Sequence, residues 1–152
     1  MGDGYILGAV RTAIGKRGGV LSTTRPDDLA AECLKGLVDS AGVDPRHIED
    51  VVMGCVTQTG EQGMNIGRMA PLLAGFPITV TGTSVNRMCA SSLQAVNFAA
   101  MGVMSGMQDL TVGAGVESMS RVTMGSDAGP LNDRLSDRFD IIPQGLSAKL
   151  VA

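Results

Sequence analysis

One cysteine stands where a polar turn runs into an apolar stretch. Cys89 follows Asn86 and Arg87, and the residues after it are small or apolar as far as about Ser105. We expect Cys89 in the first turn of a helix, where unpaired N–H groups and the helix dipole favour the thiolate form of a cysteine. A thiolate can take an acyl group from a thioester, hold it covalently and pass it to a second nucleophile. Cys89 is therefore the candidate for covalent catalysis.

The chain has three cysteines and one histidine. Free cysteines are among the most buried residue types, so an inert packing role is the alternative for each of them. Cys33 falls on the apolar face of a predicted helix and Cys55 inside a predicted strand, which favours packing for both. His47 follows a proline turn between a helix and a strand, and we interpret it as a surface connector. We find no metal-ligand spacing in the sequence.

The elements that must position Cys89 follow from the hydrophobic pattern. Short apolar runs alternate with helical stretches, which predicts βαβ units and an α/β fold with a mixed, largely parallel sheet and helices on both faces. We expect strands at residues 5–10, 51–56, 78–85 and 110–116, and helices at residues 27–41, 65–73 and 89–105. Asp27 or Asp28 should cap the first helix and Gly42 should end it. The helix after Cys89 is apolar or small on every side, which predicts that other elements enclose it.

Composition excludes several functional classes. A net charge of −3 provides no basic footprint for nucleic acid. Arg87 is the only charged residue between Arg68 and Asp109, but polar residues, glycines and prolines interrupt this span, so we predict no membrane helix. Three cysteines cannot all pair and no signal segment opens the chain, which favours the cytoplasm.

The character of the chain changes near its end. After Met119 the residues become rich in Gly, Asp, Pro and Arg, with little periodicity. We therefore place a boundary near Ser118. This divides the chain into an α/β domain at residues 1–118 and a second, truncated segment at residues 119–152.

The wider pattern around Cys89 closely resembles the thiolase family. The matching segments are residues 6–12, 62–68, 86–95, 113–120 and 143–148. They cover essentially the whole chain, although thiolases are much longer than 152 residues. The resemblance implies the N-terminal half of a thiolase-like fold, and it makes residues 119–152 the beginning of the loop domain that lies over the substrate.

The same resemblance implies a reaction and a set of residues. A thiolase either cleaves a 3-ketoacyl-CoA with CoA or condenses two acyl-CoA molecules, so coenzyme A is a co-substrate and no cofactor is permanently bound. Cys89 would carry the acyl group, and its backbone N–H would donate to the thioester oxyanion. Gln144, Gly145 and Ser147 would contact the substrate. A homo-oligomer, a dimer or a tetramer, is also implied.

Thiolases activate the nucleophile with a histidine and move a second proton with another cysteine, both from the C-terminal half. Neither lies in these residues, so we expect the isolated chain to have little turnover. The alternative is a non-catalytic thiolase-like binding or interaction domain, or a truncated product. A beta-ketoacyl synthase fits less well, because residues 116–120 resemble thiolase. Ser92 stands where thiolases commonly have glycine, and Pro143-Gln144 resembles the broader 3-ketoacyl type.

Overall fold

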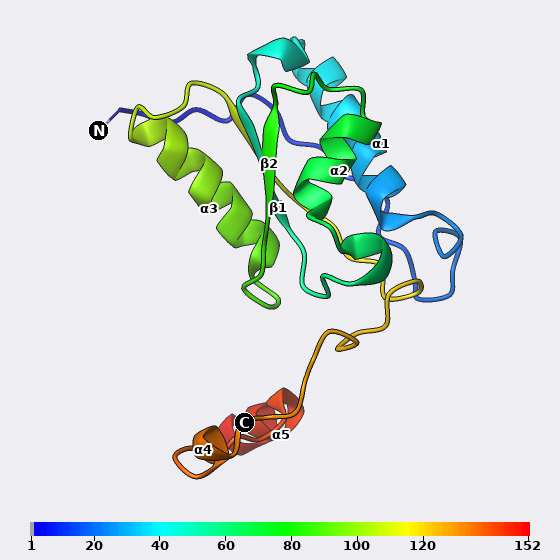
Figure 1. Cartoon of the computed structure of the whole chain (residues 1–152), viewed down its shortest axis with the longest axis vertical. Coiled ribbons are helices and arrows are strands. Elements are labelled where there is room, and N and C mark those ends of the chain that lie inside the picture. Colours follow the sequence, from blue (N-terminus) through cyan, green and yellow to red (C-terminus); the bar gives the residue numbers. More distant parts are fainter. Residues whose placement is uncertain (1) are drawn as a thin grey trace.

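A three-stranded parallel sheet forms the centre of the molecule (Figure 1). The computed structural model describes residues 2–152. The strand order is β2-β1-β3, and both neighbours of β1 run parallel to it. The strands are β1 (Asp50–Gly54), β2 (Thr81–Val85) and β3 (Thr111–Gly115). Gly54 lies in register with Val85 and Gly115, so the three carboxyl ends share one edge of the sheet.

Two helices cover one face of the sheet, and they enclose the main apolar core. These are α1 (Pro26–Ala41) and α2 (Ile66–Leu73), which pack on each other and, through α2, on β1 and β2. Leu34 of α1, Ile66 of α2 and Met53 of β1 are almost fully buried in this core. Short 3-10 turns, η1 (Pro45–His47) and η2 (Gly60–Gln62), flank β1 in the sequence.

The first helix begins earlier than the cap prediction placed it. The expected cap at Asp27 or Asp28 is wrong, because the helix starts at Pro26 with Arg25 as its N-cap. Proline suits this first position because it has no N–H to leave unpaired and its φ is already helical. The Asp27 carboxylate instead accepts from the Arg25 guanidinium at 2.8 and 3.0 Å. The predicted end is confirmed, since Gly42 has a left-handed φ of 64°.

Helix α3 (Ser91–Met104) covers the opposite face, so the predicted helices on both faces are confirmed. Its inner side packs Ala95 and Ala99 against Val52 of β1. Its outer side is open: Leu93 is 66% exposed and Met101 is 59% exposed. The expectation that this helix is enclosed is wrong for residues 2–152, because the sheet covers one side and no described element covers the other.

The expected strand at residues 5–10 does not form. These residues have no regular secondary structure, and Tyr5 is 79% exposed and Ile6 is 85% exposed. An apolar run becomes a strand only when a neighbouring backbone pairs with it, and within residues 2–152 β3 pairs only with β1. The segment is attached near its ends, where the Gly2 N–H donates to Met104 O at 2.9 Å and Cys33 Sγ contacts Val10 O at 3.9 Å.

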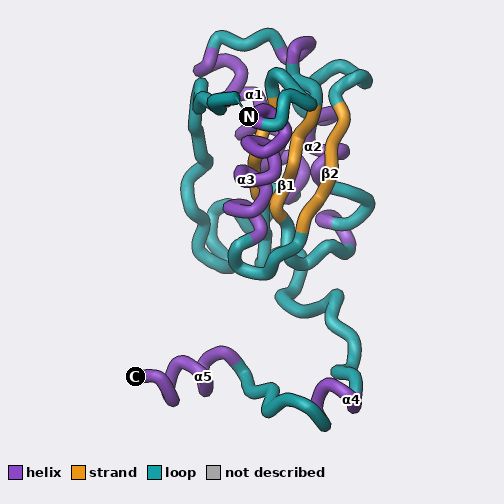
Figure 2. Tube along the Cα trace, turned by 90° about the vertical axis from the view of Figure 1, so that its left-hand side faces the viewer, coloured by secondary structure: helices purple, strands orange, loops and turns teal. Residues whose placement is uncertain are grey.

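The last part of the chain is set apart from the sheet, as Figures 1 and 2 show. It contains two short helices, α4 (Asp133–Ser136) and α5 (Gln144–Val151). From residue 123 onward every side chain except that of Ser147 is exposed. The domain division near Ser118 stays a prediction. Within residues 2–152, no helix combines the length and apolarity needed to cross a membrane.

Candidate active site

Cys89 lies in a tight turn that joins β2 to α3. We call residues 86–90 the Cys89 turn. Met88 has a positive φ of 47°, which is unusual for a residue with a side chain. Ala90 N–H donates to Arg87 O at 3.1 Å, which closes the turn. The side chain of Cys89 is exposed, so a molecule in solution can reach the thiol.

The prediction that Cys89 lies in the first helical turn is wrong by two residues. The helix begins at Ser91 with Ala90 as its N-cap. Ser91 Oγ donates to Met88 O at 2.6 Å, and the left-handed backbone of Met88 is not helical. These two features hold the turn outside the helix, so Cys89 stands just before the helix N-terminus.

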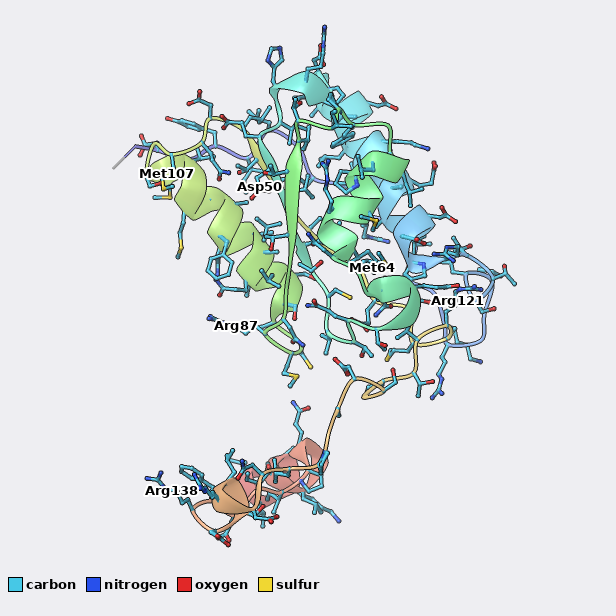
Figure 3. The ribbon with its side chains drawn as sticks, in the orientation of Figure 1. Asp50, Met64, Arg87, Met107, Arg121 and Arg138 are labelled. Carbon is cyan, nitrogen blue, oxygen red and sulfur yellow. The ribbon has the colours of Figure 1, made fainter. Side chains whose placement is uncertain are left out.

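Polar side chains hold the Cys89 turn in place. Asn86 Oδ1 accepts from the backbone N–H of Met88 at 2.8 Å, and Asn86 Nδ2 donates to Val56 O at 2.9 Å. The backbone N–H of Arg87 donates to Ser91 Oγ at 2.9 Å, and its guanidinium donates to Gln94 Oε1 at 2.7 Å. Figure 3 shows Arg87 at one end of the sheet and Asp50, which begins β1, toward the other. The turn therefore lies at the carboxyl edge, where parallel sheets usually place their sites.

Glycines at the strand ends let the start of α3 approach the sheet closely. A Cβ added to Gly54 would lie 2.6 Å from Ser91 O and still closer to the backbone of Ser92. A Cβ added to Gly115 would overlap the Ser92 side chain. Ser92 is the residue that stands where the resemblance leads us to expect glycine. Because Gly115 has no side chain, there is room for the Ser92 hydroxyl.

A polar cluster adjoins the turn, in which Gln62 and Thr57 are buried and Glu117 is exposed, and sequence reasoning missed it. Glu117 accepts hydrogen bonds from the backbone N–H of Val56 at 2.8 Å and from that of Thr57 at 3.3 Å. Gln62 is fully buried, and its Nε2 donates to Glu117 Oε1 at 2.7 Å. Its Oε1 accepts from the backbone N–H of Ser118 at 2.7 Å. Glu117, which directly follows the predicted strand at residues 110–116, was the available signal.

The structure separates the three cysteines chemically. Cys55 is 1% exposed, and burial, followed by the nearby charge of Glu117, raises the pKa of its thiol to about 12. The predicted packing role of Cys55 agrees with this burial. Cys33 is half-buried on α1. Cys89 is the only exposed thiol among residues 2–152.

This contrast predicts selective alkylation. Brief treatment of the folded chain with iodoacetamide at pH 8 should modify Cys89 and leave Cys55 unmodified, because a thiol with a pKa of about 12 is thiolate in about one molecule in ten thousand at that pH. Peptide mass mapping measures the modified fraction at each cysteine. The urea-unfolded chain is the control and should react at all three. Equal labelling of Cys55 and Cys89 in the folded chain would contradict the assignment.

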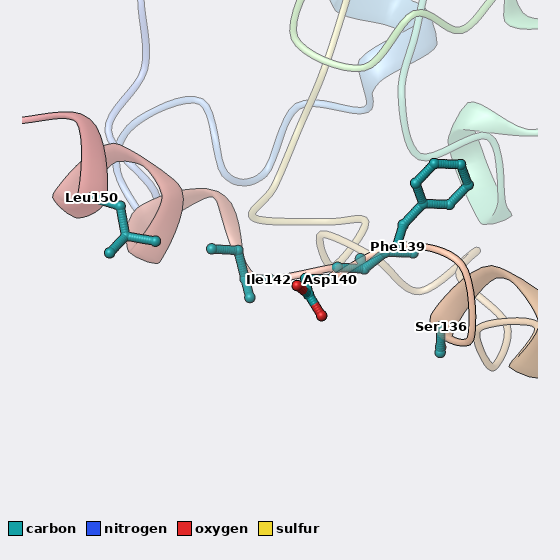
Figure 4. Close-up of a pocket in the computed structure, with 6 residues that line it drawn as sticks. Ser136, Phe139, Asp140, Ile142 and Leu150 are labelled. Atoms are coloured by element: carbon teal, nitrogen blue, oxygen red, sulfur yellow. The ribbon is translucent and has the colours of Figure 1, made fainter.

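The predicted substrate residues lie far along the chain from this turn. Gln144, Gly145 and Ser147 are on α5, which Figures 1 and 2 show apart from the sheet. Figure 4 shows a concave region in this part of the molecule. Its lining residues are Ser136, Phe139, Asp140, Ile141, Ile142 and Leu150. Neither Cys89 nor the three predicted residues line it, so their role in substrate binding stays a prediction.

His47 lies at the opposite edge from Cys89. It ends η1, three residues before β1 begins, and its side chain is exposed. The interpretation as a surface connector agrees with this position. In the described part of the chain, no group of three His, Cys, Asp or Glu side chains is arranged to hold a metal ion.

These features define a class. The protein is an α/β protein with a parallel sheet, and an exposed cysteine stands on a strand–turn–helix connection at the carboxyl edge. Strand-to-helix turns of this kind are used to present nucleophiles for acyl transfer.

Comparison with known proteins identifies the family. Residues 4–141 match the family described as thiolase, N-terminal domain. The chain is 46% identical over 143 residues to the 3-oxoadipyl-CoA/3-oxo-5,6-dehydrosuberyl-CoA thiolase of Escherichia coli, covering 92% of this chain and 35% of the relative. It is 45% identical over 126 residues to a steroid 3-ketoacyl-CoA thiolase of Mycobacterium tuberculosis, covering 83% of this chain and 31% of the relative.

A solved structure gives the same result. The crystal structure of the Bacillus anthracis acetyl-CoA acetyltransferase is 36% identical and superposes with a TM-score of 0.74, covering 91% of this chain and 34% of that one. The chain belongs to the thiolase family and has the fold of a thiolase N-terminal domain. It spans about a third of the length of these relatives.

Proposed function

We propose that this chain contributes the nucleophile of a thiolase-type acyl transfer. The observation that carries the proposal is the exposed Cys89 thiol on the strand–turn–helix connection. On an acyl-CoA the thiolate attacks the thioester carbonyl, the C–S bond breaks, and the CoA thiolate leaves and takes up a proton. On a 3-ketoacyl-CoA it attacks the 3-keto carbon, the C2–C3 bond breaks, and the departing acetyl-CoA carbanion takes up a proton; in both cases the acyl group becomes bonded to Sγ. Thiolysis by CoA, or carbon–carbon bond formation with a second acyl-CoA, then releases the thiol.

The complete cycle needs groups that these residues do not place beside Cys89. His47, the only histidine, lies at the opposite edge of the sheet. We therefore propose that the residues act as the N-terminal part of a longer thiolase, in which a histidine and a second cysteine move the protons. The 152 residues alone would then accept an acyl group slowly and would not turn over. A homo-oligomeric assembly and a cytoplasmic location are part of this proposal, from the resemblance and the cysteine content.

Substrate preference is proposed at the level of the class. The relatives named above act on CoA-linked 3-oxo acids of different size, and the loop segment of this chain has Pro143-Gln144. This pattern resembles thiolases of broad 3-ketoacyl specificity, so we propose 3-ketoacyl-CoA substrates rather than acetoacetyl-CoA alone.

The test is the formation of an acyl-enzyme. The 152-residue chain incubated with acetyl-CoA should gain one acetyl group, and peptide mapping should place it on Cys89. Free CoA should be released in equal amount, without continued turnover. A chain whose Cys89 is alkylated by iodoacetamide but never acetylated would contradict the proposal and favour the non-catalytic binding domain.

A further inference from the structure

The ends of the three parallel strands are joined by side-chain hydrogen bonds rather than by the sheet alone. Asn86 is the first residue after β2, Val56 follows β1 by two residues, and Glu117 follows β3 by two residues. These residues come from distant parts of the sequence and meet because the sheet order places β1 between β2 and β3. The hydrogen bonds that join them lead from Glu117 through Val56 to Asn86, which is the first residue of the Cys89 turn.

Glu117 fixes the loop after β1. Its Oε2 accepts from the Val56 N–H at 2.8 Å, and its Oε1 accepts from the Thr57 N–H at 3.3 Å. Adjacent backbone N–H groups held by the two oxygens of one carboxylate leave the loop little freedom, and hydrogen bonds to a charged acceptor are about twice as strong as neutral ones.

Gln62 fixes Glu117 in turn. Its Nε2 donates to Glu117 Oε1 at 2.7 Å and to Thr57 O at 2.9 Å, and it is fully buried. A buried amide with all its contacts satisfied restricts its neighbours, because any shift leaves a polar group unpaired. The loop after β1 is therefore held from two sides.

Asn86 transmits this position to the turn. Its Nδ2 donates to Val56 O at 2.9 Å, while its Oδ1 accepts from the Met88 N–H at 2.8 Å. The Asn86 side-chain amide thus joins the loop after β1 to Met88. The left-handed φ of Met88 sets the path of the chain into Cys89. Without the Val56 contact the Asn86 side chain could still bond to Met88, but nothing would tie that local turn to the sheet edge.

We propose that Asn86 and Glu117 are positioning residues for Cys89, joined through the backbone of Val56 into one relay. The relay fixes the direction from which the thiol meets an acyl carbonyl. This inference rests on the proposed function for its effect on acyl transfer, because misplacing a reacting atom by about 1 Å can cost about a hundredfold in rate.

Two variants break the relay at different points in the full 152-residue chain. Asn86→Ser keeps a short oxygen that can bond to the Met88 N–H but cannot reach Val56. Glu117→Gln keeps the shape but replaces one acceptor oxygen with an NH₂ group, so at least one N–H of the loop or of Gln62 faces another donor. Arg121→Gln is the matched control. It removes the 2.6 Å contacts of Arg121 with Glu61 in the segment after β3, outside the relay.

The readout is the rate of Cys89 acetylation as a function of acetyl-CoA concentration. We expect the maximal rate to fall about 10- to 100-fold in Asn86→Ser and in Glu117→Gln, with the half-saturating concentration unchanged. Arg121→Gln should keep the normal rate. The double variant should lose no more than the more damaged single variant, because residues in one relay are not additive.

Three results would overturn the relay: a normal maximal rate in Asn86→Ser, the same loss in Arg121→Gln, or additive losses in the double variant. If Asn86→Ser does not give a cooperative melting transition, the comparison of the acetylation rates of Glu117→Gln and Arg121→Gln decides whether the relay exists. If the unsubstituted chain is never acetylated, the proposed function is refuted. The relay is then tested by the rate at which iodoacetamide alkylates Cys89. That rate should fall in both relay variants and stay normal in Arg121→Gln; equal rates in all three would refute the relay.

Discussion

Replacing Cys89 with alanine is expected to reduce CoA-dependent acyl transfer by about 10⁴-fold or more, since the nucleophile of a cooperative catalytic unit cannot be replaced by its neighbours. The measurement is kcat/KM for thiolysis of a 3-ketoacyl-CoA by a longer polypeptide that carries both these residues and the histidine of the proposed function. Acetylation of the 152-residue chain should vanish in the same variant. Loss of the side chain from an exposed position should leave the fold intact, which a melting curve checks.

Cys33→Ala is the matched control. Cys33 is half-buried on α1, on the face of the sheet opposite to α3, and its variant should keep normal acyl transfer. Cys55 is a poorer control because it is packed in the core and contacts the Gln62–Glu117 pair. Thiolysis that survives in Cys89→Ala would remove Cys89 from the mechanism and direct attention to these two thiols.

Local patterns in the sequence were enough to predict most of the elements around Cys89. The strands at residues 51–56, 78–85 and 110–116 were predicted within a few residues, because each is a short run bounded by turn residues. Gly42 was predicted as the end of a helix because few other residues adopt a left-handed backbone at low cost. The thiol at a strand–turn–helix connection followed from the polar residues before it and the apolar helix after it.

Features that depend on distant pairing were not predictable. Residues 5–10 have the composition of a strand, but strand formation depends on a partner backbone that the sequence pattern does not reveal. The bond between Gln62 and Glu117 joins residues 55 positions apart, and only the sheet order brings them together. Ser91 fell in the first turn of the predicted helix at residues 89–105. Its hydroxyl instead bonds back to Met88, and the helix starts at Ser91, past Cys89.

Close backbone contact between β1 and α3 explains why the end of β1 requires glycine, and this leads to a prediction about stability. Gly54 adjoins the first residues of α3, and an added Cβ would lie 2.6 Å from Ser91 O, where real Cβ atoms essentially never stand. The nearest atoms are all backbone atoms of Ser91 and Ser92, so no side-chain rotation relieves the clash. Gly54→Ala must therefore push the start of α3 away from the sheet.

We expect Gly54→Ala to destabilise the chain by about 3 kcal/mol, the upper part of the range for overpacked cores, and to shift the Cys89 turn with the helix. Denaturant unfolding followed by circular dichroism measures the change. Gly36→Ala is the control, since Gly36 lies in the middle of α1 with open space around its Cβ position. That variant should stabilise the chain by about 0.5–1 kcal/mol, because alanine is the better helix former. Equal stability of the two variants would show that α3 can move away from β1 without cost, and the close packing would then not hold the Cys89 turn in place.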